Sequence, residues 1–423
     1  MFERIFQLQE HGTTVKQEVL AGITIFFAAA HIIIVNPTIL ADGGIPFNYA
    51  MIATVFVTVI GSLLLGLWAN VPLALAPGMG INAFFVYTLV QGYDLSWQMG
   101  LAVVIVSGVF LMIATFTPLA AALSRAVPNS LKFSISAGIG LLLVMIGLQM
   151  GEVIVADEET LITLAPLESP SLAFTLLGLL LILILYVKRV KGAFVIGLLV
   201  TTAIIYLTGS GGGAIESEPL DLGGYMGIFT TADFSGLWHV PFWMAVFSLT
   251  LLILFDTLGL VHGLVPHGKD VNRVYQGSAI NAGISGFFGT SPTVLVVESA
   301  AGMAEGGKTG LTAVTAGLLF LSSFIVMPFI SGVPDAAIAP ILIIVGMSMA
   351  EKLRDIPGDF TEWFPAGLTA ILIPLTYSII DGLAAGFILY PLMKWVTGRR
   401  ADVHPYQYVI ALLFICNYAL LLM

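Results

Sequence analysis

Charged residues and cysteine are scarce in this sequence. Only 9% of its 423 residues are charged and 58% are hydrophobic, whereas a soluble globular protein carries roughly 25% charged residues. The shortage of charge excludes an ordinary water-soluble domain. Because the apolar runs are long and continuous rather than alternating, they predict an all-α protein that crosses a lipid bilayer many times. The single cysteine, Cys416, excludes an intrachain disulfide framework and a cysteine-rich metal site.

Signatures of enzymes and metalloproteins are also missing. No three or four ligands have the spacing of a metal site, and the sequence has no phosphate-binding P-loop and no evident nucleophile–base pair. We therefore expect no catalytic residue, no metal and no cofactor. The net charge of −10 does not indicate a nucleic-acid or other charged partner, because most acids lie in a few loops. Residues 1–18 are polar and precede no signal-peptide core, so we expect a cytoplasmic lead-in.

Apolar segments of the length that crosses a bilayer follow one another along the chain. About 20 residues are needed for one helical crossing, and we predict fourteen segments before Arg399, at 20–40, 49–68, 72–90, 99–121, 131–150, 171–187, 191–208, 239–260, 274–288, 292–304, 309–330, 334–350, 363–379 and 382–397. A further segment, 405–422, either spans or lies along the membrane. The third and tenth segments are interrupted by glycine, proline and polar residues.

Loop charges set the orientation of these segments. Lys188, Arg189 and Lys191 place one connection in the cytoplasm, whereas the acidic loops at 151–169 and 209–238 hold no basic residue and belong outside. Seven segments precede the second acidic loop and seven follow it. Because seven is odd, the second set runs opposite to the first. We therefore predict a 7+7 inverted repeat whose broken third and tenth segments meet near the midplane, where substrate binds.

Two carboxylates lie deep inside the predicted segments. Asp256 is in the eighth, within SLTLLILFDTLG, and Glu298 is in the tenth, within VLVVESAAG. An ionisable side chain at membrane depth is costly and is by default a functional candidate. We find no Lys or Arg at comparable depth, so we favour substrate binding and proton coupling by both acids. A structural ion pair or hydrogen bond is the alternative.

The third segment contains APGMGINAFF, which predicts an unwound turn followed by a half-helix that starts near Asn82. We expect Gly80 and Asn82 to shape the substrate pocket. Close helix packing is the alternative for Gly80, and an interhelical hydrogen bond or helix cap is the alternative for Asn82. His31, in the first segment, is either a further binding residue or a satisfied packing residue. Pro37 is predicted to end or kink that first helix.

Paired carboxylates favour a neutral ligand that carries N–H donors. An ionised carboxylate accepts two hydrogen bonds at once, which suits a planar purine or pyrimidine base. An anion site would instead need basic residues. Two acids in one desolvated site repel each other when both are ionised, so one of them retains a proton near neutral pH. This arrangement supplies proton coupling without a cofactor.

The motifs LALAPGMGINAFF, GTSPTVLVVESAAGMAEGGKTGLTA, LFDTLG and VLAGITIFF…IIIVNPTIL resemble the AzgA-like purine permeases, a nucleobase–cation symporter branch of the xanthine/uracil permeases. The resemblance runs from Gly22 to Arg400. It implies 14 spans in a core and a gate domain, and proton symport of adenine, guanine or hypoxanthine by alternating access across the bacterial inner membrane.

The resemblance also implies roles for individual residues. Asp256 and Glu298 would bind the base, and Gly80 and Asn82 would line its pocket. Val296 and Val297 would offer backbone groups beside Glu298. His31 stands where we expect a tyrosine in such permeases, which bears on substrate preference and on pH dependence.

The same resemblance divides the chain into domains. The core domain comprises 19–122 (spans 1–4) and 239–332 (spans 8–11), and the gate domain comprises 123–208 (spans 5–7) and 333–398 (spans 12–14). The lead-in 1–18, the external loop 209–238 and the segment 399–423 complete the chain. A large apolar gate surface is compatible with a homodimer. The alternatives are a xanthine/uracil-type carrier on the same fold, an anion carrier of related architecture, and, from other classes, a channel or an intramembrane enzyme.

Overall fold

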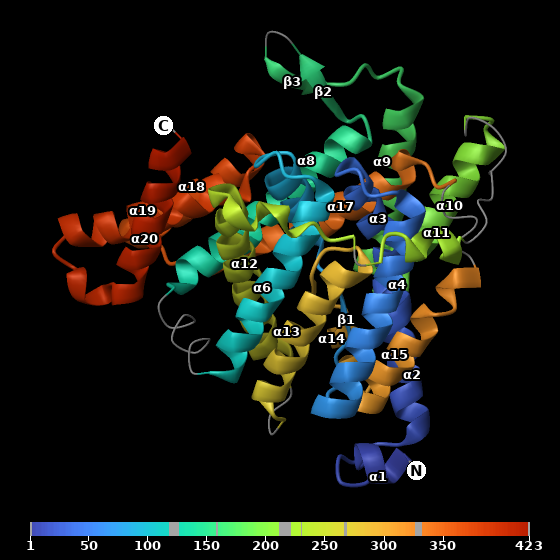
Figure 1. Ribbon diagram of the computed structural model, residues 1–423. Coiled ribbons are helices and arrows are strands. Elements are labelled where there is room, and N and C mark those ends of the chain that lie inside the picture. Colours follow the sequence, from blue (N-terminus) through green and yellow to red (C-terminus); the bar gives the residue numbers. More distant parts are fainter. Residues whose placement is uncertain are drawn as a thin grey trace.

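A computed structural model of the protein describes residues 2–117, 127–157, 160–210, 221–229, 231–265, 269–325 and 332–421. Residues 211–220 and 230 of the predicted external loop lie outside these ranges. The described chain is mostly helical, as predicted (Figure 1). Eight of its helices are long and apolar enough to cross a membrane: Val15–Asp42, Phe47–Ala69, Trp97–Phe116, Asn129–Met150, Pro170–Val187, Val240–Leu258, Asp335–Asp355 and Ile379–Val396.

The first half of the chain contains, in order, α1 (Phe2–Phe6), α2 (Val15–Ala29), α3 (Ile32–Asp42), α4 (Phe47–Leu64), the π-helical η1 (Leu65–Ala69), β1 (Leu75–Pro77), α5 (Met79–Ala83), the π-helical η2 (Phe84–Val90), α6 (Trp97–Phe116), α8 (Asn129–Met150), β2 (Ile154–Asp157), β3 (Leu161–Leu164), α9 (Pro170–Val187) and α10 (Ala193–Leu207). The hairpin of β2 and β3 lies in the acidic loop that the sequence places outside.

The second half contains α11 (Leu222–Met226), η3 (Phe234–Trp238), α12 (Val240–Leu264), α13 (Val271–Phe288), β4 (Thr293–Leu295), α14 (Ser299–Ala304), α15 (Gly310–Phe320), α17 (Asp335–Ala350), η4 (Glu351–Asp355), α18 (Phe360–Thr376), α19 (Ile379–Val396), η5 (Arg400–Asp402) and α20 (Pro405–Leu421). The C-terminal apolar segment is therefore helical, and α20 packs against α19.

The two interrupted segments meet, as the sequence predicted. Strand β1 pairs antiparallel with β4, with Ala76 opposite Val294. The Val296 N–H donates to the Ala74 carbonyl at 3.0 Å, which extends the pairing beyond the strands. Backbone groups at membrane depth must find partners inside the protein, and this two-stranded contact supplies them for both segments.

A short helix follows each strand. α5 begins at Met79, so the expectation that this half-helix starts near Asn82 was wrong by about one turn. The reason is that Gly78 adopts an extended conformation and acts as the N-cap, which lets the helix begin immediately. Asn82 therefore lies in the first turn. In the second segment Glu298 is the N-cap residue of α14.

The first membrane segment breaks at an unexpected place. Pro37 lies inside α3 and does not end it. The chain instead turns at Ala30 and His31, between α2 and α3, where the Ile33 N–H donates to the Ala30 carbonyl at 3.2 Å. Proline fixes a helical φ value and removes only one hydrogen bond, so α3 tolerates Pro37. The break presents His31 at the interior.

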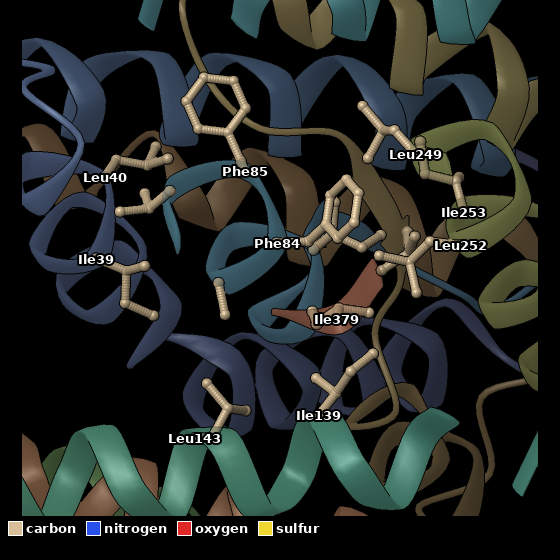
Figure 2. Packing of buried hydrophobic residues seen from close by; sticks show 14 of the residues in the cluster. Ile39, Leu40, Phe84, Phe85, Ile139, Leu143, Leu249, Leu252, Ile253 and Ile379 are labelled. Carbon is tan, nitrogen blue, oxygen red and sulfur yellow. The ribbon is translucent and has the colours of Figure 1, made fainter. Parts of the chain in front are cut away.

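The hydrophobic core surrounds the third segment. Figure 2 shows Phe84 of η2 with side chains of α12, α3 and α8 around it, among them Leu252, Ile39 and Ile139. Helices α2, α4 and α15 pack together, and α6 packs along α13. Helix α8 packs closely with α17 and α18, and α18 packs with α19. In Figure 1 the latter group lies beside the former, with α5 and α12 touching α8 between them.

Candidate functional site

Glu298 stands where β4 ends and α14 begins. Its side chain is 22% exposed, and its ion-pair contact within the described chain is with His31, whose Nε2 lies 3.8 Å from Glu298 Oε1. That separation is longer than a hydrogen bond. The structure thus brings together two of the residues predicted for the site, from the first and the tenth membrane segments.

His31 is 1% exposed. Its Nδ1 lies 3.0 Å from the Ala28 carbonyl oxygen, so Nδ1 carries a hydrogen and donates it. In the neutral ring, Nε2 is then an acceptor that faces Glu298. The imidazole also packs against the ring of Phe194, at the start of α10, with a centroid separation of 4.9 Å.

Asp256 lies in the middle of α12 and is partly buried. It makes no hydrogen bond or ion pair with another residue of the described ranges. Its neighbours Phe255 and Thr257 are buried. Helix α12 packs against β4 and α5, so the helix that carries Asp256 lies beside both interrupted segments.

Asn82 belongs to a fully buried polar network. The Ser291 hydroxyl lies within hydrogen-bond distance of Asn82 Oδ1, and 3.4 Å from Asn36 Oδ1. Asn36 Nδ2 donates to Thr54 Oγ1 at 2.6 Å and to Thr290 Oγ1 at 3.2 Å. These contacts join α3, α4, α5 and the segment before β4. Asn82 Nδ2 has no partner among the described residues, which leaves one buried donor for a ligand or water.

Sequence reasoning missed Asn36 and Ser291 as members of this network. Both are polar residues in or next to apolar segments, which was the available signal. Ser291 lies 255 residues from Asn36 and 209 residues from Asn82 along the chain, and these long separations hid the contacts.

Gly80 packs against helix α8. A Cβ added at Gly80 would lie 2.4 Å from Ile139 Cγ2, so this glycine allows close approach of the two helices. That geometry matches the packing alternative. The Val297 side chain is 58% exposed, and its carbonyl accepts from the Ala300 N–H at 3.0 Å. The Val296 N–H is used by Ala74 and is therefore not free for a ligand.

One basic side chain near the end of a membrane segment is buried. Lys394 of α19 is 0% exposed, and its Nζ lies 2.7 Å from Glu362 Oε1 of α18. The sequence placed Lys394 at the end of a span, where a lysine would reach water, but α18 supplies a carboxylate that keeps it inside. Lys394 is therefore already paired and does not neutralise Glu298. Among the described residues, no group of three or more His, Cys, Asp and Glu could hold a metal ion.

Comparisons with known proteins show the family of this chain. The model of the Permease family, Xan_ur_permease, matches residues 16–384. The nucleobase transporter PlAzg2 of Paenibacillus larvae is 44% identical over 390 residues, which cover 89% of this chain and 77% of that protein. The guanine/hypoxanthine permease PbuO of Bacillus subtilis is 38% identical over 426 residues, which cover 97% of this chain and 98% of that protein.

A solved structure supports the fold alone. The transmembrane domain of the bicarbonate transporter BicA, from a cyanobacterium, matches with a TM-score of 0.65 and 16% identity, over 88% of this chain and 97% of that one. Its low identity carries no information on the ligand. The family match and the two close relatives show that this chain is a multi-pass plasma-membrane transport protein of the Permease family, in the branch of the AzgA-like purine permeases that the sequence motifs indicated.

Proposed function

We propose that this protein takes up purine nucleobases by proton symport, through alternating access. The observation that carries the proposal is the placement of two carboxylates without a basic partner of fixed charge among the described residues. Glu298 lies at the junction of β4 and α14, and Asp256 lies on the helix packed against β4. The names of the relatives PlAzg2 and PbuO support a nucleobase as the ligand.

The chemistry of the carboxylates favours a purine. An ionised carboxylate in a poorly hydrated site accepts two N–H donors strongly, and guanine carries adjacent N–H donors at N1 and its exocyclic amine. In the proposal one carboxylate binds this edge of the base while the other exchanges the coupled proton. The unpartnered amide of Asn82 would provide a further polar contact near the paired strands. Gly80 would shape the pocket by letting α8 approach.

Alternating access requires two bodies that move against each other. We assign the core domain to 19–122 and 239–332 and the gate domain to 123–208 and 333–398, in a 7+7 inverted repeat of fourteen segments. The packing of α2, α4 and α15 and of α6 with α13 supports the first body, and the packing of α8 with α17 and α18 supports the second. The pairing of β1 with β4 supports a repeat in which the third and tenth segments correspond.

Uptake of labelled adenine, guanine and hypoxanthine, in cells that lack their own carriers, tests the proposal. Glu298→Gln and Asp256→Asn should each weaken saturable uptake by about 10- to 100-fold, the value of a lost charge-assisted hydrogen bond. Glu351→Gln is the matched control, because Glu351 lies in η4, away from the site, and is 64% exposed. Normal uptake by both acid variants would refute the site, and absence of purine uptake by the wild type would refute the function.

Two further measurements separate the alternatives. A protonophore should abolish accumulation, whereas removal of sodium should not. Unlabelled xanthine and uracil should compete weakly with the labelled purines. Strong competition by either base would favour the xanthine/uracil-type carrier, and competition by bicarbonate would favour an anion carrier.

A further inference from the structure

The pair formed by His31 and Glu298 has one place for a proton. Because Nδ1 donates to the Ala28 carbonyl at 3.0 Å, Nε2 of the neutral ring carries a lone pair, and this atom lies 3.8 Å from the carboxyl group. A lone pair and a carboxylate oxygen repel each other. The contact becomes favourable only when a proton lies between the two atoms, either on the carboxyl group or on the ring.

The surroundings favour one shared proton over two separate charges. The imidazole is 1% exposed and the carboxylate 22%, so an isolated ion on either group would lose most of its hydration. Within the described chain no Lys or Arg forms an ion pair with Glu298, and no carboxylate other than Glu298 lies within ion-pair distance of His31.

Other titratable groups on the elements that pack against α2, α3 and α14 lie near element ends or have partners elsewhere. They are Lys16 and Glu18 in the first turn of α2, Asp42 at the end of α3 with Tyr87 of η2, Tyr49 of α4, Tyr206 of α10, Asp335 at the start of α17, and Glu305 after α14. Asp256 of α12, which packs against β4, is the remaining interior carboxylate. His31 and Glu298 therefore form an interior pair that has no further charged partner among these groups.

The hairpin of α9 and α10 closes over this pair. The Phe194 ring packs at a tilt against the His31 ring, with centroids 4.9 Å apart, and Tyr186 of α9 packs at a tilt against Phe194, with centroids 5.6 Å apart. In the connection between the two helices, Lys191 Nζ lies 2.8 Å from Glu305 Oε1, just after α14. The same hairpin thus contacts both His31 and the far end of the short helix that Glu298 begins.

From these contacts we propose that His31 and Glu298 share the coupled proton, and that Phe194 covers the pair and controls its exchange with cytoplasmic water. The inference rests on the proposed function, because it assigns a place to the proton within that function. The step is a proton transfer only. When the 3.8 Å gap between the two atoms closes to hydrogen-bond distance, protonated Glu298 donates its O–H to Nε2. The proton passes to water when the hairpin moves away, which leaves a carboxylate and a neutral ring.

The pH dependence of uptake tests the shared proton. Uptake by the wild type should fall as the pH rises through the midpoint at which the pair loses its proton. His31→Phe removes the acceptor that stabilises the protonated carboxyl group, so the midpoint should move down by about one pH unit, the value of one hydrogen bond. His31→Gln keeps an acceptor oxygen, so its midpoint should stay close to that of the wild type. This readout differs from a lowered maximal rate, which a purely structural residue would also produce.

The outcomes separate the inference from the function on which it rests. A wild type that takes up no purine at any pH refutes both. A wild type with a clear midpoint that stays unchanged in His31→Phe and His31→Gln refutes the shared proton and leaves the function standing. If His31→Phe does not reach the membrane, His31→Leu, which likewise offers no acceptor, takes its place, and an unchanged midpoint in that variant refutes the shared proton.

The role of Phe194 as a cover over His31 and Glu298 is tested by measuring proton leak. In proteoliposomes that contain a pH-sensitive dye, Phe194→Ala should raise substrate-independent proton entry several-fold over the wild type. Phe116→Ala, at an aromatic residue of α6 that is 56% exposed, is the control and should not change it. Equal leak in Phe194→Ala and the control would overturn the role of Phe194.

Discussion

The buried ion pair between α18 and α19 makes the most quantitative prediction. Lys394 is 0% exposed and Glu362 is 17% exposed, and their charged atoms lie 2.7 Å apart. Removing one partner of a buried pair leaves an uncompensated charge and destabilises a protein by about 3–5 kcal/mol. Glu362→Gln and Lys394→Met should therefore both lower the free energy of unfolding.

The two losses should be unequal. Without Lys394, the carboxylate of Glu362 still accepts from the Ser130 hydroxyl and from the Tyr390 hydroxyl, the latter at 2.8 Å, and retains some contact with water. Without a carboxylate at 362, the ammonium of Lys394 loses its counter-charge and is left with neutral contacts among the described residues, such as the Thr361 hydroxyl at 2.9 Å and the face of the Tyr390 ring at 5.2 Å. Glu362→Gln should therefore be the more damaging change, toward the upper end of that range.

Thermal unfolding of the purified protein in detergent measures the difference. The double variant, Lys394→Met with Glu362→Leu, removes both charges and should be more stable than either single variant, because an apolar pair of similar volume avoids the desolvation cost. A double variant as unstable as the worse single variant would refute the reasoning. So would a Lys394→Met protein that is less stable than Glu362→Gln.

Two further predictions concern the domain contact and the dependence on acid. Gly80→Ala places a methyl group 2.4 Å from Ile139 Cγ2. The clash should lower the free energy of unfolding by about 1–3 kcal/mol and slow purine uptake. Adding Ile139→Ala should recover part of the initial uptake rate. At the start of α18, the Arg399 guanidinium bonded to Asp359 lowers the pKa of Asp359 to about 2. Because the folded-state pKa lies below the usual value of about 3.9, the stabilisation is present above pH 4 or so and is lost as the pH falls towards about 2. Asp359→Asn should lower thermal stability near neutral pH and flatten its decline over that range.

Each of these two predictions has an outcome that would contradict it. Failure of Ile139→Ala to rescue Gly80→Ala would show that the clash is not the cause of the slower uptake. An unchanged acid decline in Asp359→Asn would show that other carboxyl groups dominate the loss of stability.

Prediction from the sequence succeeded where a single segment decides the outcome. Low charge and long apolar runs require a helical membrane protein, because lipid offers no hydrogen bonds to an open backbone. Glycine and proline in APGMGINAFF and in the stretch before Glu298 require interrupted segments. The assignment of roles to Asp256 and Glu298 stays a prediction that the uptake assays test.

The sequence did not reveal features whose partners come from other parts of the chain. Lys394 lies near the end of a predicted span, and only the packing of α18 shows that Glu362 keeps it buried. The break at His31 could not be read from Pro37, because the turn depends on how α2 and α3 pack against α14, α15 and α4.

By itself, the sequence determined that this protein is a helical membrane protein and that two of its segments could not be continuous helices. It also singled out Asp256 and Glu298 as carboxylates within apolar segments. These are properties of composition and local backbone chemistry. Only the tertiary structure decided that β1 pairs with β4, that Ser291 reaches Asn82 across 209 residues, and that the imidazole of His31 faces Glu298. Such contacts depend on which surfaces fit when the helices pack, and that fit is a property of the whole chain.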